Sequence, residues 1–309
     1  MNPVPLALLL AGLAVAVAAP AARAQAPDPS APLPLPPATC DGTDLPGVAR
    51  SLPQGGLLRG RLPPGSQLWL LDGESEAKSL RVGLQGEFLL GAGRDQAGPL
   101  RLLVSLPDGR ECEAEIAVTA REFAIERVQG VPEATVNPPP AIAARIEREQ
   151  AEVARARRRD DARADFDVEF QWPLTGRVSG VYGSQRIYNG TPKSAHSGLD
   201  VAAPKGEPVL APAAGIVTFA EPDLYLTGGT VLLDHGHGLS SSFLHLSALE
   251  VAVGQRLQQG EPIGRVGATG RATGPHLHWG LNWFDLRLDP QLLVDPLRNP
   301  QADPEDATP

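Results

Sequence analysis

The chain has 309 residues, a formal net charge of −9, two cysteines and six histidines. An acidic chain is a poor partner for the polyanionic backbone of nucleic acids, so we expect no nucleic-acid binding. The charge bears on partners and solubility and does not indicate a fold.

Residues 1–24 have the pattern of an export signal. Leu6 to Ala19 is apolar and too short for a comfortable membrane span, and Ala22-Arg23-Ala24 is typical of a cleavage site. We therefore expect a mature chain that begins at Gln25, with no stable membrane insertion after cleavage. An uncleaved anchor is the alternative, because the terminal amine is the only positive charge before the apolar run. Residues 25–39 are rich in Pro and Ala, which predicts an extended tether.

Residues 40–130 predict a small β domain with the architecture of a sandwich or small barrel. Short apolar runs alternate here with turn residues. Cys40 and Cys112 fall in this region, and an even cysteine count in an exported chain predicts a disulfide between them. Two free buried thiols are the alternative. The predicted strands are Gly56–Leu62, Gln67–Leu71, Ser79–Leu84, Glu87–Leu90, Leu100–Leu106, Cys112–Thr119 and Glu122–Val128.

Residues 137–165 predict a helical linker. Pro138 to Pro140 suit a first turn, and Ala141 to Ala164 contains no Gly or Pro and is dominated by Ala, Arg, Glu and Asp. A helix this polar lies on a domain surface or bridges two domains. Two interpretations stay open, a solvated linker and a regulatory arm that covers an active site.

Residues 166–296 predict a compact antiparallel β domain, because short strands rich in Gly, Val and Leu alternate with turn signals. Residues 297–309 are polar and rich in Pro, which predicts a disordered tail. The expected fold is thus mainly β, with two β domains joined by a helical linker.

All six histidines lie between His196 and His278. Side chains at i, i+2 and i+4 of a strand share a face, so His276 can face the same way as His278, and His196 the same way as Asp200. His245 lies on an apolar strand between the two pairs. Three nitrogen and oxygen ligands with water in the fourth position are typical of catalytic zinc, whereas calcium and magnesium need more oxygens. From spacing alone, a coincidental grouping remains the alternative.

Several ordered motifs between Trp172 and Phe284 resemble the lysostaphin-like (LytM-type) zinc metallopeptidases, which cut the peptides of bacterial peptidoglycan. The resemblance covers a little over a third of the chain. It rests on His196-Ser-Gly-Leu-Asp200, Val209-Leu-Ala-Pro-Ala-Ala-Gly215, Asp234-His-Gly-His-Gly-Leu239, Phe243-Leu-His-Leu-Ser247, Gln259-Gly-Glu-Pro-Ile-Gly264 and Gly267-Ala-Thr-Gly-Arg-Ala-Thr-Gly-Pro-His-Leu-His278.

The resemblance implies that His196, Asp200 and His278 bind one Zn²⁺, and that His245 and His276 are unbound catalytic histidines. Zinc lowers the pKa of a bound water and polarises a peptide carbonyl. One histidine then moves a proton and the other stabilises the oxyanion, and the sequence leaves open which does which.

Other residues near these motifs are candidates for substrate contact or for a structural role. Arg186, Tyr188 and Asn189 precede the first predicted ligand and are candidate substrate contacts. His235 and His237 fit a structural role in a hairpin turn. Many relatives carry an acidic residue where this chain has Gly280, so we expect Asn282 or a backbone carbonyl to orient the metal-bound histidine instead.

Together these features predict an exported, periplasmic, zinc-dependent endopeptidase that cleaves peptide stems or cross-links of peptidoglycan. Two alternatives differ in class. The chain could be a non-catalytic peptidoglycan-binding module that activates another cell-wall hydrolase, or a hydrolase held latent by its N-terminal domain or helix. The sequence leaves its protein partners open.

Overall fold

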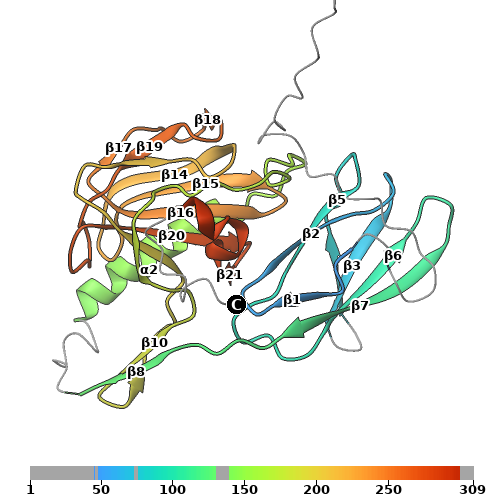
Figure 1. Cartoon of the computed structure of the whole chain (residues 1–309), viewed down its shortest axis with the longest axis horizontal. Coiled ribbons are helices and arrows are strands. Elements are labelled where there is room, and N and C mark those ends of the chain that lie inside the picture. The colour runs from blue at the N-terminus through green and yellow to red at the C-terminus, as the bar shows by residue number, and fades with distance from the viewer. Residues whose placement is uncertain (1–44, 46–47, 73–75, 130–138, 300–309) are drawn as a thin grey trace, which may run out of the picture.

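The computed structural model describes residues 45, 48–72, 76–129 and 139–299. The predicted export signal, tether and Cys40 lie outside this part of the chain, as does most of the predicted tail. The described residues form two β-rich regions side by side, with α2 beside the larger one (Figure 1). No helix in the described ranges is long and apolar enough to cross a membrane.

The N-terminal region is a β-sandwich-like unit, as the alternating strands predict. A five-stranded sheet has the order β1-β7-β6-β3-β4, with β1 parallel to β7, and a separate antiparallel pair is formed by β2 and β5. All five residues of β5 are buried. The strands are β1 (Ser51–Pro53), β2 (Leu57–Arg61), β3 (Gln67–Asp72), β4 (Glu76–Leu80), β5 (Glu87–Gly91), β6 (Leu100–Ser105) and β7 (Glu111–Thr119).

Two predictions for this region need correction. The strand predicted over Ser79–Leu84 is β4, which ends at Leu80, because the chain then turns over Gly83–Gly86 and leaves the Leu84 side chain 83% exposed. The last predicted strand is β8 (Ile125–Val128), which leaves the N-terminal sheet and pairs in parallel with β10 of the C-terminal region. Cys112 is buried on β7, and its predicted pairing with Cys40 stays a prediction.

The predicted linker helix is present as α2 (Pro140–Arg157), which begins with Pro at its first turn. It is shorter than predicted, because residues after Arg157 form ion pairs with the β regions instead of continuing the helix. Arg163 pairs with Asp234, and Asp165 with Arg256. Near its other end, Arg145 donates to the carbonyl of Asp223 at 2.7 Å. Both ends of α2 are therefore tied to the C-terminal region.

The C-terminal region is built on one large antiparallel sheet, as predicted, in the order β18-β14-β15-β16-β20-β12-β9, with β21 paired to β20. Smaller sheets join β13, β19 and β17, and β11, β10 and β8. The strands are β9 (Arg177–Gly180), β10 (Gln185–Tyr188), β11 (Thr191–Pro192), β12 (Gly198–Ala202), β13 (Pro208–Leu210), β14 (Gly215–Leu224), β15 (Gly228–Gly236), β16 (Leu239–Leu246), β17 (Ala248–Leu249), β18 (Arg256–Leu257), β19 (Pro262–Arg265), β20 (His276–Trp283) and β21 (Leu286–Leu288).

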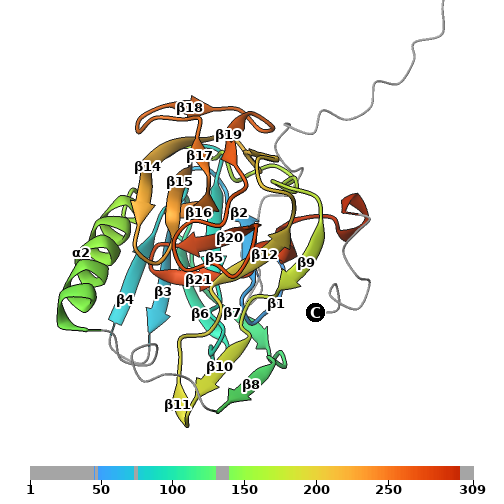
Figure 2. The ribbon, with the colours of Figure 1, turned by 90° about the vertical axis from the view of Figure 1, so that its left-hand side faces the viewer.

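The two regions share one continuous hydrophobic core, and Figure 2 shows the N-terminal strands behind the large sheet. Gly91 at the end of β5 lies against Trp283, so closely that an added Cβ would lie 3.0 Å from the indole ring. Arg61 pairs with Asp167, and Arg121 pairs with the buried Asp289 at 2.9 Å. The contact between the regions is therefore both apolar and ionic.

The C-terminal end of the described chain is more ordered than predicted. Two short 3₁₀ helices follow β21, η1 (Pro290–Leu293) and η2 (Pro296–Arg298). The amide side chain of Asn299 is buried and exchanges two hydrogen bonds with the backbone of Gly176. The predicted tail from residue 297 thus begins too early, because this amide fixes residues 297–299 to the domain.

Candidate metal centre and active site

Strand register brings the predicted ligands together. In the large sheet, β12 and β20 are antiparallel, and Asp200 lies directly opposite His278. His196 lies just before β12 rather than on it, where its backbone exchanges hydrogen bonds with Gly183 and Ser184. The chain packs closely here, because a Cβ added to Gly198 would lie 2.9 Å from Nε2 of His278. Glycine at position 198 thus leaves room for the imidazole of His278.

Three ligand atoms converge on one point. Nε2 of His196, Oδ1 of Asp200 and Nδ1 of His278 lie 2.9–3.1 Å from one another, and they form the group of described residues that could hold a metal ion. Nδ1 of His196 donates to the carbonyl of Val181 at 3.0 Å, which leaves a lone pair on Nε2 toward the cluster. Two imidazole nitrogens and one carboxylate oxygen are the ligand set of catalytic zinc, so these residues fit the predicted metal.

The environment keeps two of these ligands, Asp200 and His278, in the protonation states that a metal needs. Burial alone would raise the pKa of Asp200, but hydrogen bonds with His196 and His278 outweigh it and hold this pKa well below its usual range. Burial lowers the pKa of His278 to about 4, against the opposing effect of Asp200. The carboxylate is therefore ionised and the imidazole neutral near pH 7.

The two predicted catalytic histidines lie beside this cluster. His276 shares the face of β20 with His278, and its Nε2 lies 3.9 Å from Oδ1 of Asp200. The ring centroid of His245 lies 4.8 Å from that of His276 and 6.4 Å from that of His278. Nδ1 of His276 contacts the carbonyl of Gly274 at 2.8 Å, and Nδ1 of His245 contacts that of Thr269 at 2.8 Å. With Nδ1 donating in each case, Nε2 is the free acceptor.

The remaining predicted residues are only partly placed. Arg186 and Tyr188 lie on β10, but their side chains lie outside the described residues, and Asn189 follows in a turn with φ of 50°. Their role as substrate contacts stays a prediction. Asn282 does not orient His278, because its Oδ1 accepts from Arg287 at 2.8 Å, and Nε2 of His278 has no hydrogen-bond partner among the described residues.

His235 and His237 have structural surroundings, as the sequence suggested. His235 is fully buried, with Nδ1 donating to the carbonyl of Ala214 and Nε2 2.9 Å from the hydroxyl of Ser241. His237 packs against Phe166 with ring centroids 4.9 Å apart. Neither belongs to the metal cluster.

Comparison with known proteins identifies the family. Residues 194–290 match the model described as Peptidase family M23. A crystal structure of a Pseudomonas aeruginosa protein assigned to peptidase M23 is 32% identical, with a TM-score of 0.60, and the match covers 78% of this chain and 94% of that one. The chain belongs to peptidase family M23. Because the match covers more than the C-terminal half, the likeness to that M23 protein extends into the N-terminal region.

Three further similar proteins are longer than this chain, and the match covers only part of each. The cell division protein DipM of Caulobacter vibrioides is 33% identical over 161 residues, which cover 52% of this chain and 25% of DipM. The peptidoglycan DD-endopeptidase ShyA of Vibrio cholerae is 37% identical over 117 residues, covering 38% of this chain and 26% of ShyA. The DD-carboxypeptidase/endopeptidase Mpg of Neisseria meningitidis is 47% identical over 85 residues, covering 27% of this chain and 19% of Mpg. The chain thus spans about a fifth to a quarter of these relatives.

Proposed function

We propose that this M23 protein is a zinc-dependent endopeptidase that cleaves peptide stems or cross-links of peptidoglycan, acting outside the cytoplasm, in the periplasm. The observation that carries the proposal is the convergence of His196, Asp200 and His278, with the free Nε2 atoms of His245 and His276 beside them. The names of ShyA and Mpg support a peptidoglycan peptide as substrate. The apolar N-terminal sequence supports export.

His196, Asp200 and His278 would hold the zinc ion, which supplies a lowered water pKa and a Lewis acid for the scissile carbonyl. The protein's own groups supply proton transfer. Burial lowers the pKa of His245, so its imidazole is neutral near pH 7 and can accept a proton at Nε2. His276, whose Nε2 lies 3.9 Å from Oδ1 of Asp200, is the second group. When both of its ring nitrogens carry a proton, its Nε2 donates a hydrogen bond to the developing oxyanion.

The test is digestion of purified sacculi by the mature chain, with and without a chelator, followed by mass spectrometry of the released muropeptides. Chelator-sensitive loss of cross-linked species is the expected result, together with one zinc per chain and no digestion by His196→Ala. Digestion that survives both the chelator and the variant would refute the proposal. A chain that holds one zinc yet digests nothing would favour the latent hydrolase or the non-catalytic binding module.

A further inference from the structure

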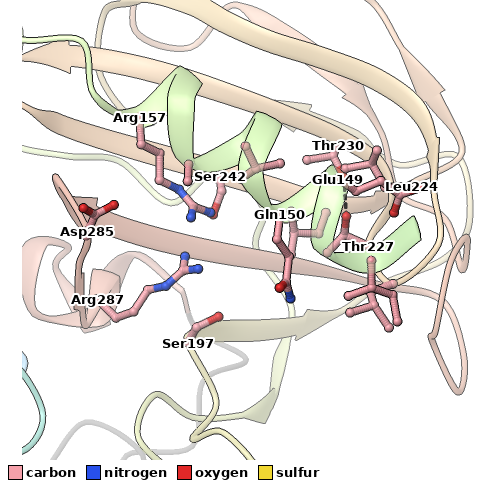
Figure 3. A pocket seen from close by; sticks show the side chains of 15 residues that line it. Glu149, Gln150, Arg157, Ser197, Leu224, Thr227, Thr230, Ser242, Asp285 and Arg287 are labelled. Carbon is pink, nitrogen blue, oxygen red and sulfur yellow. Dashed lines mark hydrogen bonds between the residues drawn. The ribbon is translucent and has the colours of Figure 1, made fainter. Parts of the chain in front are cut away.

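A cavity of about 480 Å³ separates α2 from the large sheet (Figure 3). Gln150 and Arg157 line it from the helix, and Ser242 and Leu244 line it from β16. Ser197, the residue after His196, lines it as well. Leu244 lies opposite His278 in the sheet, so the cavity adjoins the metal cluster. α2 is therefore a wall of a space that opens beside the candidate active site.

Two arginines face one end of this cavity. Arg157 comes from the last turn of α2 and Arg287 from β21, and Figure 3 shows both guanidinium groups directed into the same space, with Asp285 nearby. Neither arginine forms an ion pair with any residue that the structure describes; Asp285 acts on them only through longer-range attraction. Two positive charges thus share one carboxylate that lies outside ion-pair distance.

The polar atoms around these arginines are incompletely paired. Nε of Arg157 is buried without a hydrogen-bond partner among the described residues. Nη1 of Arg287 donates to Oδ1 of Asn282, whereas Nδ2 of Asn282, a residue 1% exposed, has no described partner. Burial, with repulsion from Arg287, lowers the pKa of Arg157 to about 9. A buried donor without a partner costs free energy, and so do two positive charges held close together. An anion between Arg157 and Arg287 would lower both free-energy costs.

The distance between the two arginines and the metal cluster sets the length of a ligand that could contact both. Asn282, the partner of Arg287, lies four residues beyond His278 on β20, a distance of about 13 Å at a rise of ~3.3 Å per residue. An extended peptide of about four residues spans that distance. Ser242, which lines the cavity and lies opposite Gly280 in the sheet, is placed between His278 and Asn282 along this path.

We propose that Arg157 and Arg287 bind a free carboxylate of the peptide substrate, held about four residues from the bond that is cut. Guanidinium groups match carboxylates with paired hydrogen bonds, and a peptide that carries a terminal carboxylate supplies this anion. The proposal rests on the proposed peptidase function for its choice of ligand. It assigns α2 a part in substrate recognition, which differs from both the solvated linker and the regulatory arm that its sequence left open.

The test compares two tetrapeptides, L-Ala-D-isoglutamine-L-Lys-D-Ala with a free C-terminal carboxylate and the same peptide as its C-terminal amide. Binding to the chelator-treated full chain is measured by calorimetry, so that no hydrolysis occurs. We expect the acid to bind at least ~10-fold more tightly than the amide, because the amide loses the charge-assisted hydrogen bonds that a carboxylate accepts from a guanidinium. Arg157→Gln and Arg287→Gln should each reduce this preference severalfold.

Arg155→Gln is the matched control, since Arg155 lies on the same helix and is exposed; it should keep the preference. Arg287→Lys keeps the positive charge but loses the planar guanidinium group that donates paired hydrogen bonds. Circular dichroism of each variant separates a loss of recognition from misfolding. Equal affinity for acid and amide in the parent chain would overturn the inference, as would an unchanged preference in both Gln variants. Faster hydrolysis by Arg157→Gln with an unchanged preference would also overturn it and show α2 to be an obstruction.

Failure of this inference and failure of the proposed function give different results. A chain that prefers the acid through both arginines but digests no sacculi has the carboxylate site without the proposed activity. A chain that digests sacculi but binds acid and amide alike has the activity without this site.

Discussion

At the scale of single residues, the backbone of His245 shows how the candidate site is assembled. Regular alternation along β16 would turn His245 to the same side as the fully buried Phe243, away from Leu244 and the cavity. His245 instead has φ of 64°, and its ring lies beside that of His276. A non-glycine residue in the left-handed region costs about 1–3 kcal/mol, and such strain is concentrated at functional sites.

Replacing either free histidine should separate catalysis from metal binding. His245→Ala and His276→Ala should each lower kcat for peptidoglycan cleavage by about 10²–10⁴-fold, the usual contribution of a positioned acid or base. Zinc content should stay at one equivalent, because His196, Asp200 and His278 are unchanged. Metal analysis beside muropeptide release measures both quantities. A variant that keeps the parent rate would remove that histidine from the mechanism.

The buried His235 should make stability depend on pH. Burial lowers its pKa from 6.5 to about 4. The unfolded chain therefore takes up a proton near pH 6.5 and the folded chain only near pH 4, so the free energy of unfolding falls as the pH drops between these values. At pH 5 the loss is about 2 kcal/mol relative to pH 7.5.

Urea unfolding of the chelator-treated chain at pH 7.5 and pH 5 checks this dependence. His235→Gln should lose about 2 kcal/mol less between the two pH values than the parent does. His237, whose pKa burial also lowers to about 4, keeps its own contribution in this variant. An identical loss in parent and variant would show that His235 titrates normally.

The sequence predicted the chemistry of the site better than its surroundings. Residue type, spacing and strand alternation were enough to group His276 with His278 and His196 with Asp200. The resemblance to a family then implied the three ligands His196, Asp200 and His278, two of which the register of β12 and β20 places opposite each other. The arginine pair could not be found this way. Arg157 and Arg287 are 130 positions apart, and only the docking of α2 on the sheet makes them neighbours.

At the scale of elements, α2 is held by few apolar contacts. Val153 and Ala156 pack against Phe219, Leu224 and Leu232, and no residue of the helix is fully buried. The sequence predicted a helix with a sparse apolar face but could not say which surface it contacts. In the same way alternation predicted β8, whereas its parallel pairing with β10 depends on the distant part of the chain.

Val153→Asp should loosen α2 without unfolding the sheet. Removing a half-buried valine and placing a carboxylate near Leu232 costs at least about 1.4 kcal/mol, so amide exchange of α2 should quicken by ~10-fold or more. Exchange in β15 and β16 should be unchanged. Ala151→Asp, at an exposed position of the same helix, is the control and should leave exchange near the parent rate. Equal protection of α2 in all three proteins would contradict this account of its docking.

At the scale of the whole molecule, the two β regions are predicted to unfold together. They share one core, and Asp289 is 3% exposed between them, where it accepts from Gln291 and pairs with Arg121. Composition shifts marked the two regions in the sequence. Nothing in the local pattern marked Arg121 and Asp289 as partners, because the pair forms only when the regions meet.

Arg121→Ala should destabilise the molecule by about 3 kcal/mol, since it leaves the Asp289 carboxylate buried without its cation. Calorimetry should show one transition for the parent and a lower or divided transition for the variant. Adding Asp289→Asn should restore part of the loss, because the amide oxygen can still accept from Gln291. If the variant melts at the parent temperature, the ionic contact contributes nothing to the joining of the two regions.

The contacts that hold both ends of α2 to the C-terminal region have a kinetic consequence. Arg145 holds the first turns to Asp223, and the segment after Arg157 is held through Arg163 to Asp234. Because α2 is held at both ends, it can move away from the sheet only when one of these two contacts breaks. A ligand bulkier than an extended peptide must therefore wait for that event. The association rate of such a ligand would reach a ceiling that further ligand cannot raise, whereas a slender peptide would enter at a rate proportional to its concentration.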